Sequence, residues 1–149
     1  MDNLETFTKQ KIAKHQIERA ISLYLDEADF ISAITLAGAA EEILGKLVKQ
    51  TGGITAYEAV GEIIEAVNEL TNKQQYSKND LNELFNSTRN NLKHLSGSEQ
   101  FVVDMKQEAN NMLYRAISNY RSLTSKETEL MKKWLATPNI EPAFMLNNA

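Results

Sequence analysis

The sequence has no cysteine, only two prolines and only six glycines among its 149 residues. The absence of cysteine excludes disulfide bonds, thiolate metal sites and a cysteine nucleophile, and it is typical of proteins from a reducing compartment. Because proline and glycine interrupt the chain so rarely, and Ala, Leu, Glu and Lys are abundant, helix is favoured almost throughout.

Long apolar runs and targeting signals are also missing. The alanine-rich run over residues 33–40 is broken by Glu41 and Glu42, so it is too short to span a membrane. The first residues, Met-Asp-Asn-Leu-Glu, are polar and acidic and lack the pattern of a signal peptide. With 42% hydrophobic residues the chain can build one core of ordinary size, and we expect a soluble cytoplasmic protein.

Apolar residues recur at steps of three and four, which predicts helices over about residues 4–26, 29–50, 55–71, 77–95, 99–122 and 124–135. Capping boxes, in which a Thr and a Glu three residues later satisfy the first N–H groups, mark two of the starts, at Thr55 and Thr124. Ser98 is the expected cap of the fifth helix. The apolar residues of the third helix predict its buried face, made of Ala56, Ala59, Ile63, Val67 and Leu70.

Helices in this order predict an all-α fold, an antiparallel up-and-down bundle of five to six helices, over residues 1–137. Pro138 and Pro142 end the helical pattern, so residues 138–149 are expected to form an apolar, non-helical C-terminal tail. A helical bundle by itself indicates no function, and the function must be read from particular side chains.

Charge is distributed unevenly along the chain. The formal net charge of −4 argues against a broad nucleic-acid-binding surface. Residues 26–70 hold nine acidic and two basic residues, a net of −7, whereas residues 71–98 hold four basic and two acidic residues, a net of +2. This basic stretch is either a functional feature or ordinary surface variation.

Within that stretch lie the candidate site residues, Arg89, Asn90, Lys93 and His94. An arginine holds a phosphate through a planar fork of donors, and a histidine moves protons near neutral pH, so the two can act on a phosphodiester without a metal. On a helical wheel Arg89 lies near the edge of the apolar face, whereas Asn90 and His94 point away from the core. We therefore expect His94 in the last turn of the helix and the motif to face out of its own subunit. The other histidine, His15, lies on an outer helix face, and the sequence predicts no metal site.

Glu41 is an acid inside an apolar stripe of the second predicted helix. A buried carboxylate is costly unless it is paired or hydrogen-bonded. Either a tyrosine or an amide holds it at the edge of the stripe, or it orients Arg89 or His94 from behind. The same helix carries a strip of small residues, Gly38 and Gly45 among them, where another backbone can approach closely.

Arg89, the polar Asn90 and, after four intervening residues, His94 resemble the signature of the HEPN family (higher eukaryotes and prokaryotes nucleotide-binding). The alanine-rich segment over residues 31–45, ISAITLAGAAEEILG, also looks like the second helix of that family. The likeness covers most of the chain as a pattern of helices, and its specific part is six residues long.

The resemblance implies a metal-independent endoribonuclease of the toxin or defence type, with no cofactor, that acts on RNA as a homodimer. In such proteins two copies of the motif form one composite site. Arg89 and His94 would be catalytic, Asn90, Lys93 and Glu41 would support them, and an antitoxin or other partner protein could bind. Other family members have lost catalysis, so a nucleotide-binding, protein-binding or scaffold module is the alternative.

Overall fold

The computed structural model describes residues 3–72, 77–94 and 99–138, except for the side chains of Lys78 and Leu84. Every regular element in these ranges is helical, which confirms the predicted all-α class. The elements are α1 (Lys9–Ser22), a π-helical turn η1 (Leu23–Glu27), α2 (Phe30–Gln50), α3 (Ala56–Thr71), α4 (Lys78–Lys93), α5 (Met105–Thr124) and α6 (Glu129–Leu135). Within the described chain, none of these helices combines the length and the apolar character needed to cross a membrane. Ser98 and residues 139–149 of the predicted tail lie outside the described residues.

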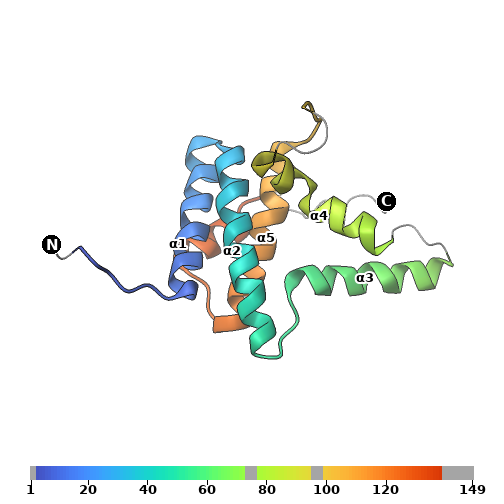
Figure 1. Cartoon of the computed structure of the whole chain (residues 1–149), viewed down its shortest axis with the longest axis horizontal. Helices are drawn as coiled ribbons and strands as arrows, with labels where there is room; N and C mark the ends of the chain where they lie inside the picture. The colour runs from blue at the N-terminus through green and yellow to red at the C-terminus, as the bar shows by residue number, and fades with distance from the viewer. Residues whose placement is uncertain (1–2, 73–76, 95–98, 139–149) are drawn as a thin grey trace.

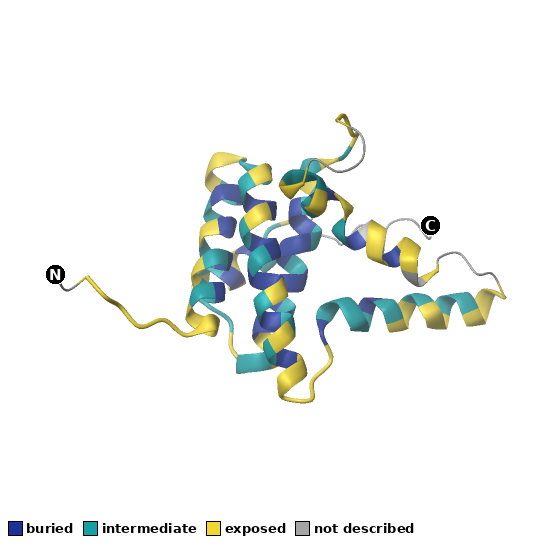
Figure 2. Ribbon diagram, in the orientation of Figure 1, coloured by how far each residue is buried: buried dark blue, intermediate teal, exposed yellow. Residues whose placement is uncertain are grey.

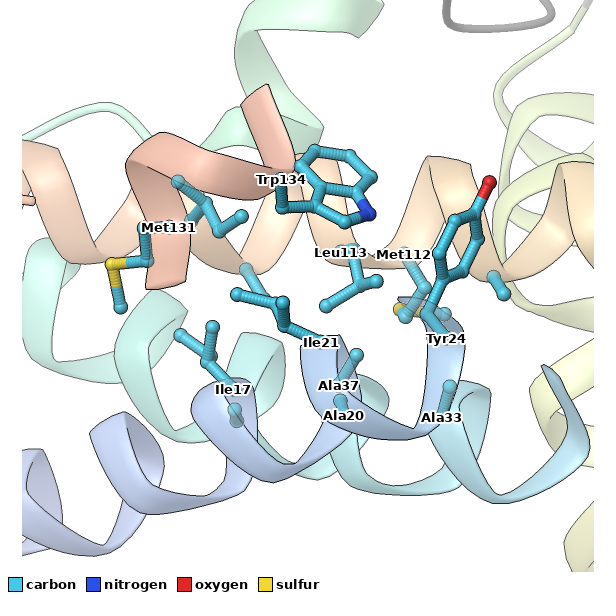
Figure 3. Close-up of a cluster of buried hydrophobic side chains, with 14 of the residues drawn as sticks. Ile17, Ala20, Ile21, Tyr24, Ala33, Ala37, Met112, Leu113, Met131 and Trp134 are labelled. Atoms are coloured by element: carbon cyan, nitrogen blue, oxygen red, sulfur yellow. The ribbon is translucent and has the colours of Figure 1, made fainter. Parts of the chain in front are cut away.

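The bundle proper consists of α1, α2 and α5, which lie side by side (Figure 1). α2 is the central helix, because its contacts with α1 and α5 are the most extensive in the molecule. The short α6 closes one side of the core with Trp134 and Met131, which lie in the same cluster as Ile21 and Leu113 (Figure 3). The ring of Trp134 is fully buried and meets Tyr24 edge-on, with 6.1 Å between the ring centres.

α3 and α4 do not run along the bundle but extend to one side of it (Figure 1). They have a small core of their own, in which Tyr57 and Ile64 pack against the buried side chains of Val60, Leu81 and Phe85. Buried residues accordingly concentrate in the bundle, whereas most of α3 is half-buried or exposed (Figure 2). The predicted bundle is therefore confirmed only as a bundle of helices. α2 and α5 run in the same direction, since Gly38 lies beside Met112 and Gly45 beside Asn119, so the antiparallel up-and-down order is wrong for this pair (Figure 1).

Side-chain caps set the first residues of α1 and α3. The hydroxyl of Thr8 accepts a hydrogen bond from the N–H of Lys11 at 3.1 Å, so α1 begins at residue 9 and not near residue 4 as predicted. Thr55 and Glu58 form a complete capping box at the start of α3, which confirms that prediction. Residues 4–8 are all exposed, Leu4 almost fully, so no burial favours an extension of α1 toward them.

The starts of α5 and α6 differ from the prediction. Asp104 caps α5 by accepting a hydrogen bond from the N–H of Gln107 at 3.0 Å, and residues 99–104 are not helical. α5 continues through Thr124, so the capping box predicted there is wrong, and Thr128 caps α6 instead. Several polar residues near a helix start are competent caps, and packing of the apolar face chooses among them.

The predicted buried face of α3 is also wrong. Ile63 and Leu70 are 51% and 86% exposed, Ala56, Ala59 and Val67 are only half-buried, and Val60 is the buried residue of this helix. The prediction placed α3 inside the bundle, where its widest apolar stripe would face the core. Because α3 instead extends away from the bundle, its buried residue is Val60, which packs with Leu81 and Phe85 of α4.

Candidate functional site

Four charged side chains from three helices meet where α4 joins the bundle. The buried carboxylate of Glu41 on α2 lies 3.6 Å from Nη1 of Arg89 on α4 and 3.7 Å from Nε of Arg115 on α5. Glu108 on α5 is hydrogen-bonded to Thr88 and interacts with Arg115. We call Glu41, Arg89, Arg115 and Glu108 the charged cluster.

Arg115 fixes α4 to the bundle. Its side chain is 5% exposed, and its Nη2 donates hydrogen bonds to the carbonyl oxygen of Phe85 at 2.8 Å and to Sδ of Met112 at 3.3 Å. Its guanidinium carbon also lies 5.0 Å from the centre of the Phe85 ring. Burial lowers the pKa of Arg115, and the nearby carboxylates of Glu41 and Glu108 oppose that shift. These carboxylates therefore compensate the charge of a guanidinium that is withdrawn from water.

Arg89 turns inward, which corrects the prediction that the whole motif faces out of the subunit. Its side chain is 16% exposed and crosses α2 at Gly38, where an added Cβ would lie 2.6 Å from Cδ of Arg89. The predicted strip of small residues thus admits a side chain and not a backbone. At the edge of an apolar face a long side chain buries its methylene groups and carries its charge to the nearest carboxylate, which is Glu41. Of the two alternatives for Glu41, the pairing with Arg89 is the one that the contact at 3.6 Å favours, and the functional role of this pairing stays a prediction.

Asn90, Lys93 and His94 lie on the solvent side of α4, as expected for Asn90 and His94. α4 ends at Lys93, and His94 follows it in an extended backbone conformation, so the imidazole stands just past the helix end and not in its last turn. The backbone N–H of His94 donates to the carbonyl of Asn90 at 2.9 Å. The helix end thereby presents an amide, an ammonium group and an imidazole to water.

Arg89 shares its carboxylate partner with a second arginine. Two guanidinium groups share the Glu41 carboxylate, and the Nε atoms of Arg89 and Arg115 are buried without a hydrogen-bond partner among the described residues. Burial raises the pKa of Glu108, against the hydrogen bond from Thr88 and the charge of Arg115. A guanidinium group in this setting keeps the capacity to attract an anion.

Among the residues that the structure describes, no group of three or more His, Asp or Glu is placed to hold a metal ion. His15 is exposed on α1, which lies on the other side of α2 from α4 (Figure 1). The structure thus brings Glu41 to Arg89 and leaves Asn90, Lys93 and His94 at the adjacent helix end. The roles assigned to these residues stay predictions.

Asn119 and Arg115 are two important residues that the sequence analysis missed. The side-chain oxygen of Asn119 accepts a hydrogen bond from the N–H of Ala56 at 2.7 Å, and its amide donates to the carbonyl of Glu41 at 3.3 Å. It thus joins the start of α3 to α2. Glu108, Arg115 and Asn119 recur at helical spacing on a helix that must be largely buried, and that polar stripe was the available signal.

We expect Glu41→Gln to lower the free energy of unfolding by about 3–5 kcal/mol, because it leaves a buried guanidinium without its charge partner. Urea denaturation followed by circular dichroism measures the loss. Glu42→Gln is the matched control, since the pair between the exposed Glu42 and Lys46 contributes at most about 1 kcal/mol. Equal losses in the two variants would contradict a stabilising role for the charged cluster.

Two glycine substitutions should have effects of opposite sign. Gly38→Ala places a methyl group against the stem of Arg89, and we expect a loss of about 1–3 kcal/mol in unfolding free energy. Gly61→Ala in the interior of α3 meets nothing within 4 Å, so it should gain up to about 1 kcal/mol from helix propensity. Thermal or urea denaturation compares the two, and a gain for both would show that Arg89 does not rest on Gly38.

The raised pKa of Glu108 predicts a pH dependence. Because the folded protein holds this proton more tightly than the unfolded chain, the contribution of Glu108 to stability is greatest below its ordinary pKa of 4.5 and falls as the pH rises through the folded pKa. In the wild type, Glu108 should therefore make the free energy of unfolding fall as the pH rises just above 4.5. Glu108→Gln should lack this part of the decrease. An equal change in the exposed control Glu62→Gln would count against this assignment.

The candidate site draws its residues from α2, α4 and α5. In comparisons with protein-family models, with curated proteins and with solved structures, nothing matches this chain. The geometry of the site is therefore the basis for proposing a function.

Proposed function

We propose that the protein is a metal-independent endoribonuclease of the HEPN type, with a toxin or defence role, whose composite site forms from two copies of the chain. The observation that carries the proposal is the orientation of Arg89. Glu41 holds its guanidinium, Gly38 makes room for its stem, and the exposed His94 stands just over one helical turn further on. An oriented phosphate binder beside a proton carrier is what phosphodiester cleavage without a metal requires.

In the proposed reaction the ribose 2′-hydroxyl attacks the adjacent phosphorus, and the bond from phosphorus to the 5′-oxygen breaks. The products are a 2′,3′-cyclic phosphate and a free 5′-hydroxyl. His94 of one copy takes the proton from the 2′-hydroxyl as a general base. The leaving oxygen needs a proton from a second group. The other histidine of the chain, His15, lies on another helix, so His94 of the other copy supplies this proton. This need for two proton carriers is the chemical reason to propose a homodimer.

The other motif residues have supporting roles in this proposal. Arg89 stabilises the charge that builds on the phosphate oxygens. The side chain of Asn90 donates to a phosphate oxygen or positions His94. The backbone N–H of His94 donates to the backbone carbonyl of Asn90. Lys93 adds positive charge for the RNA backbone. The nearby Glu42 opposes RNA only weakly, because its carboxylate is engaged by Lys46.

A non-catalytic nucleotide-binding, protein-binding or scaffold module is the second candidate. The burial of Arg89 favours it, because an arginine that pairs with Glu41 and fixes α4 to the bundle needs no substrate to explain it. The net charge of −4 acts in the same direction, since RNA must approach an acidic protein. The two candidates differ in whether RNA is cut.

Purified protein incubated with fluorescently labelled RNA in excess EDTA tests the proposal. We expect cleavage by the wild type and a fall in rate of at least about 100-fold in His94→Ala, the range for loss of a general acid–base group. His94 is exposed, so this variant should remain folded. His15→Ala is the matched control and should cleave at the wild-type rate, and sedimentation velocity of the same samples reports the oligomeric state.

Cleavage that continues unchanged in His94→Ala would remove the assignment of the site. Cleavage by a protein that sediments as a monomer would contradict the composite site. A folded wild type that cuts no RNA would leave the binding or scaffold role as the better description.

A further inference from the structure

A groove of about 490 Å³ lies between α3 and α4. Its apolar wall includes the rings of Tyr57 and Phe85, which meet edge-to-face with 5.3 Å between their centres. Gly61 leaves space in the groove, because nothing lies within 4 Å of a Cβ added there. Ile54, at one end, is more than half exposed. An open apolar groove of this kind is a common feature of sites that receive the apolar face of a helix.

Glu58, Glu62 and Glu65 line this groove, and Glu69 continues their row along α3. Glu58, Glu62, Glu65 and Glu69 follow one another at steps of four, three and four, so they share one face of α3. Glu58 is paired with Lys49 and belongs to the capping box of α3. The other three have no ion pair among the residues that the structure describes. The groove thus combines an apolar wall with an acidic rim.

We propose that the α3–α4 groove binds an amphipathic, basic helix of a partner protein. Large apolar side chains of that helix enter the space beside Gly61, and its Lys or Arg side chains face Glu62, Glu65 and Glu69. Opposite charges across such a contact raise the rate of encounter and select the partner.

Charge decides between this occupant and the others. A second copy of the chain that paired groove to groove through a two-fold axis would bring two acidic rows together. The chain's own residues 139–149 contain a single charged side chain, Glu141, which has the same sign as the rim. RNA is repelled for the same reason. A basic segment satisfies both the apolar wall and the acidic rim.

Phe85 connects the groove to the charged cluster. Its ring lines the groove, and its carbonyl oxygen accepts the hydrogen bond from Arg115. A helix in the groove therefore contacts α4, the helix that also carries Arg89. The binding proposal stands on the groove alone and does not depend on the proposed nuclease activity.

The test uses the full chain and a fluorescein-labelled synthetic helix of Leu and Lys, with a Leu/Glu helix as the control peptide. Fluorescence anisotropy at physiological salt should show binding of the Leu/Lys helix only. We expect Gly61→Leu, which fills the groove, and the double variant Glu62→Lys/Glu65→Lys each to weaken binding at least about tenfold. The double variant Glu5→Lys/Glu129→Lys makes the same change in net charge outside the groove and should alter binding less than about twofold.

Absence of binding, or equal weakening by the two double charge reversals, would overturn the proposal, because the second result indicates attraction by net charge only. Conversion of a dimer into a monomer by Gly61→Leu, measured by sedimentation, would assign the groove to a second copy and also overturn it. A shift of the amide NMR signals of residues 139–149 in Gly61→Leu would assign it to the chain's own C-terminal segment, with the same consequence.

Discussion

The position of α4 depends on one buried carboxylate. Glu41 faces Arg89 and Arg115, which come from two other helices, so a single acidic side chain connects α4 to both α2 and α5. The core that α4 shares with α3 is separate and small, and Leu92 is the described residue of α4 that packs against the core of the bundle. A charge pair withdrawn from water has few acceptable geometries, and it therefore specifies how the helices meet.

The same contact links stability to the proposed chemistry. Glu41 holds the guanidinium of Arg89 in place, and it also prevents Arg89 from moving freely toward a substrate. An enzyme gains from this arrangement, because a pre-oriented charge needs no rearrangement when negative charge develops on a phosphate. A scaffold gains from it too, because the pair fixes α4. Arg89 therefore serves the fold under either function, and the exposed His94 is the residue that separates them.

Local features of the structure were predictable from the sequence, and contacts between distant segments were not. The capping box of Thr55 and Glu58 is complete within four residues, so it was found. The box at Thr124 was an equally good local pattern, but α5 continues through it because its apolar face still has partners there. For the site, the anomaly of an acid in an apolar stripe pointed to Glu41, whereas Arg115 was missed because its partner lies on another helix.

The sequence by itself determined the all-α class, the outward position of Asn90 and His94, and the need for Glu41 to find a partner. Helix geometry is local, so the spacing of residues settles which of them share a face. Only the tertiary structure decided that Arg89 turns inward over Gly38, that Arg115 shares the carboxylate, and that α3 extends away from the bundle. Those outcomes depend on which faces meet, and that is set by the packing of segments far apart in the chain.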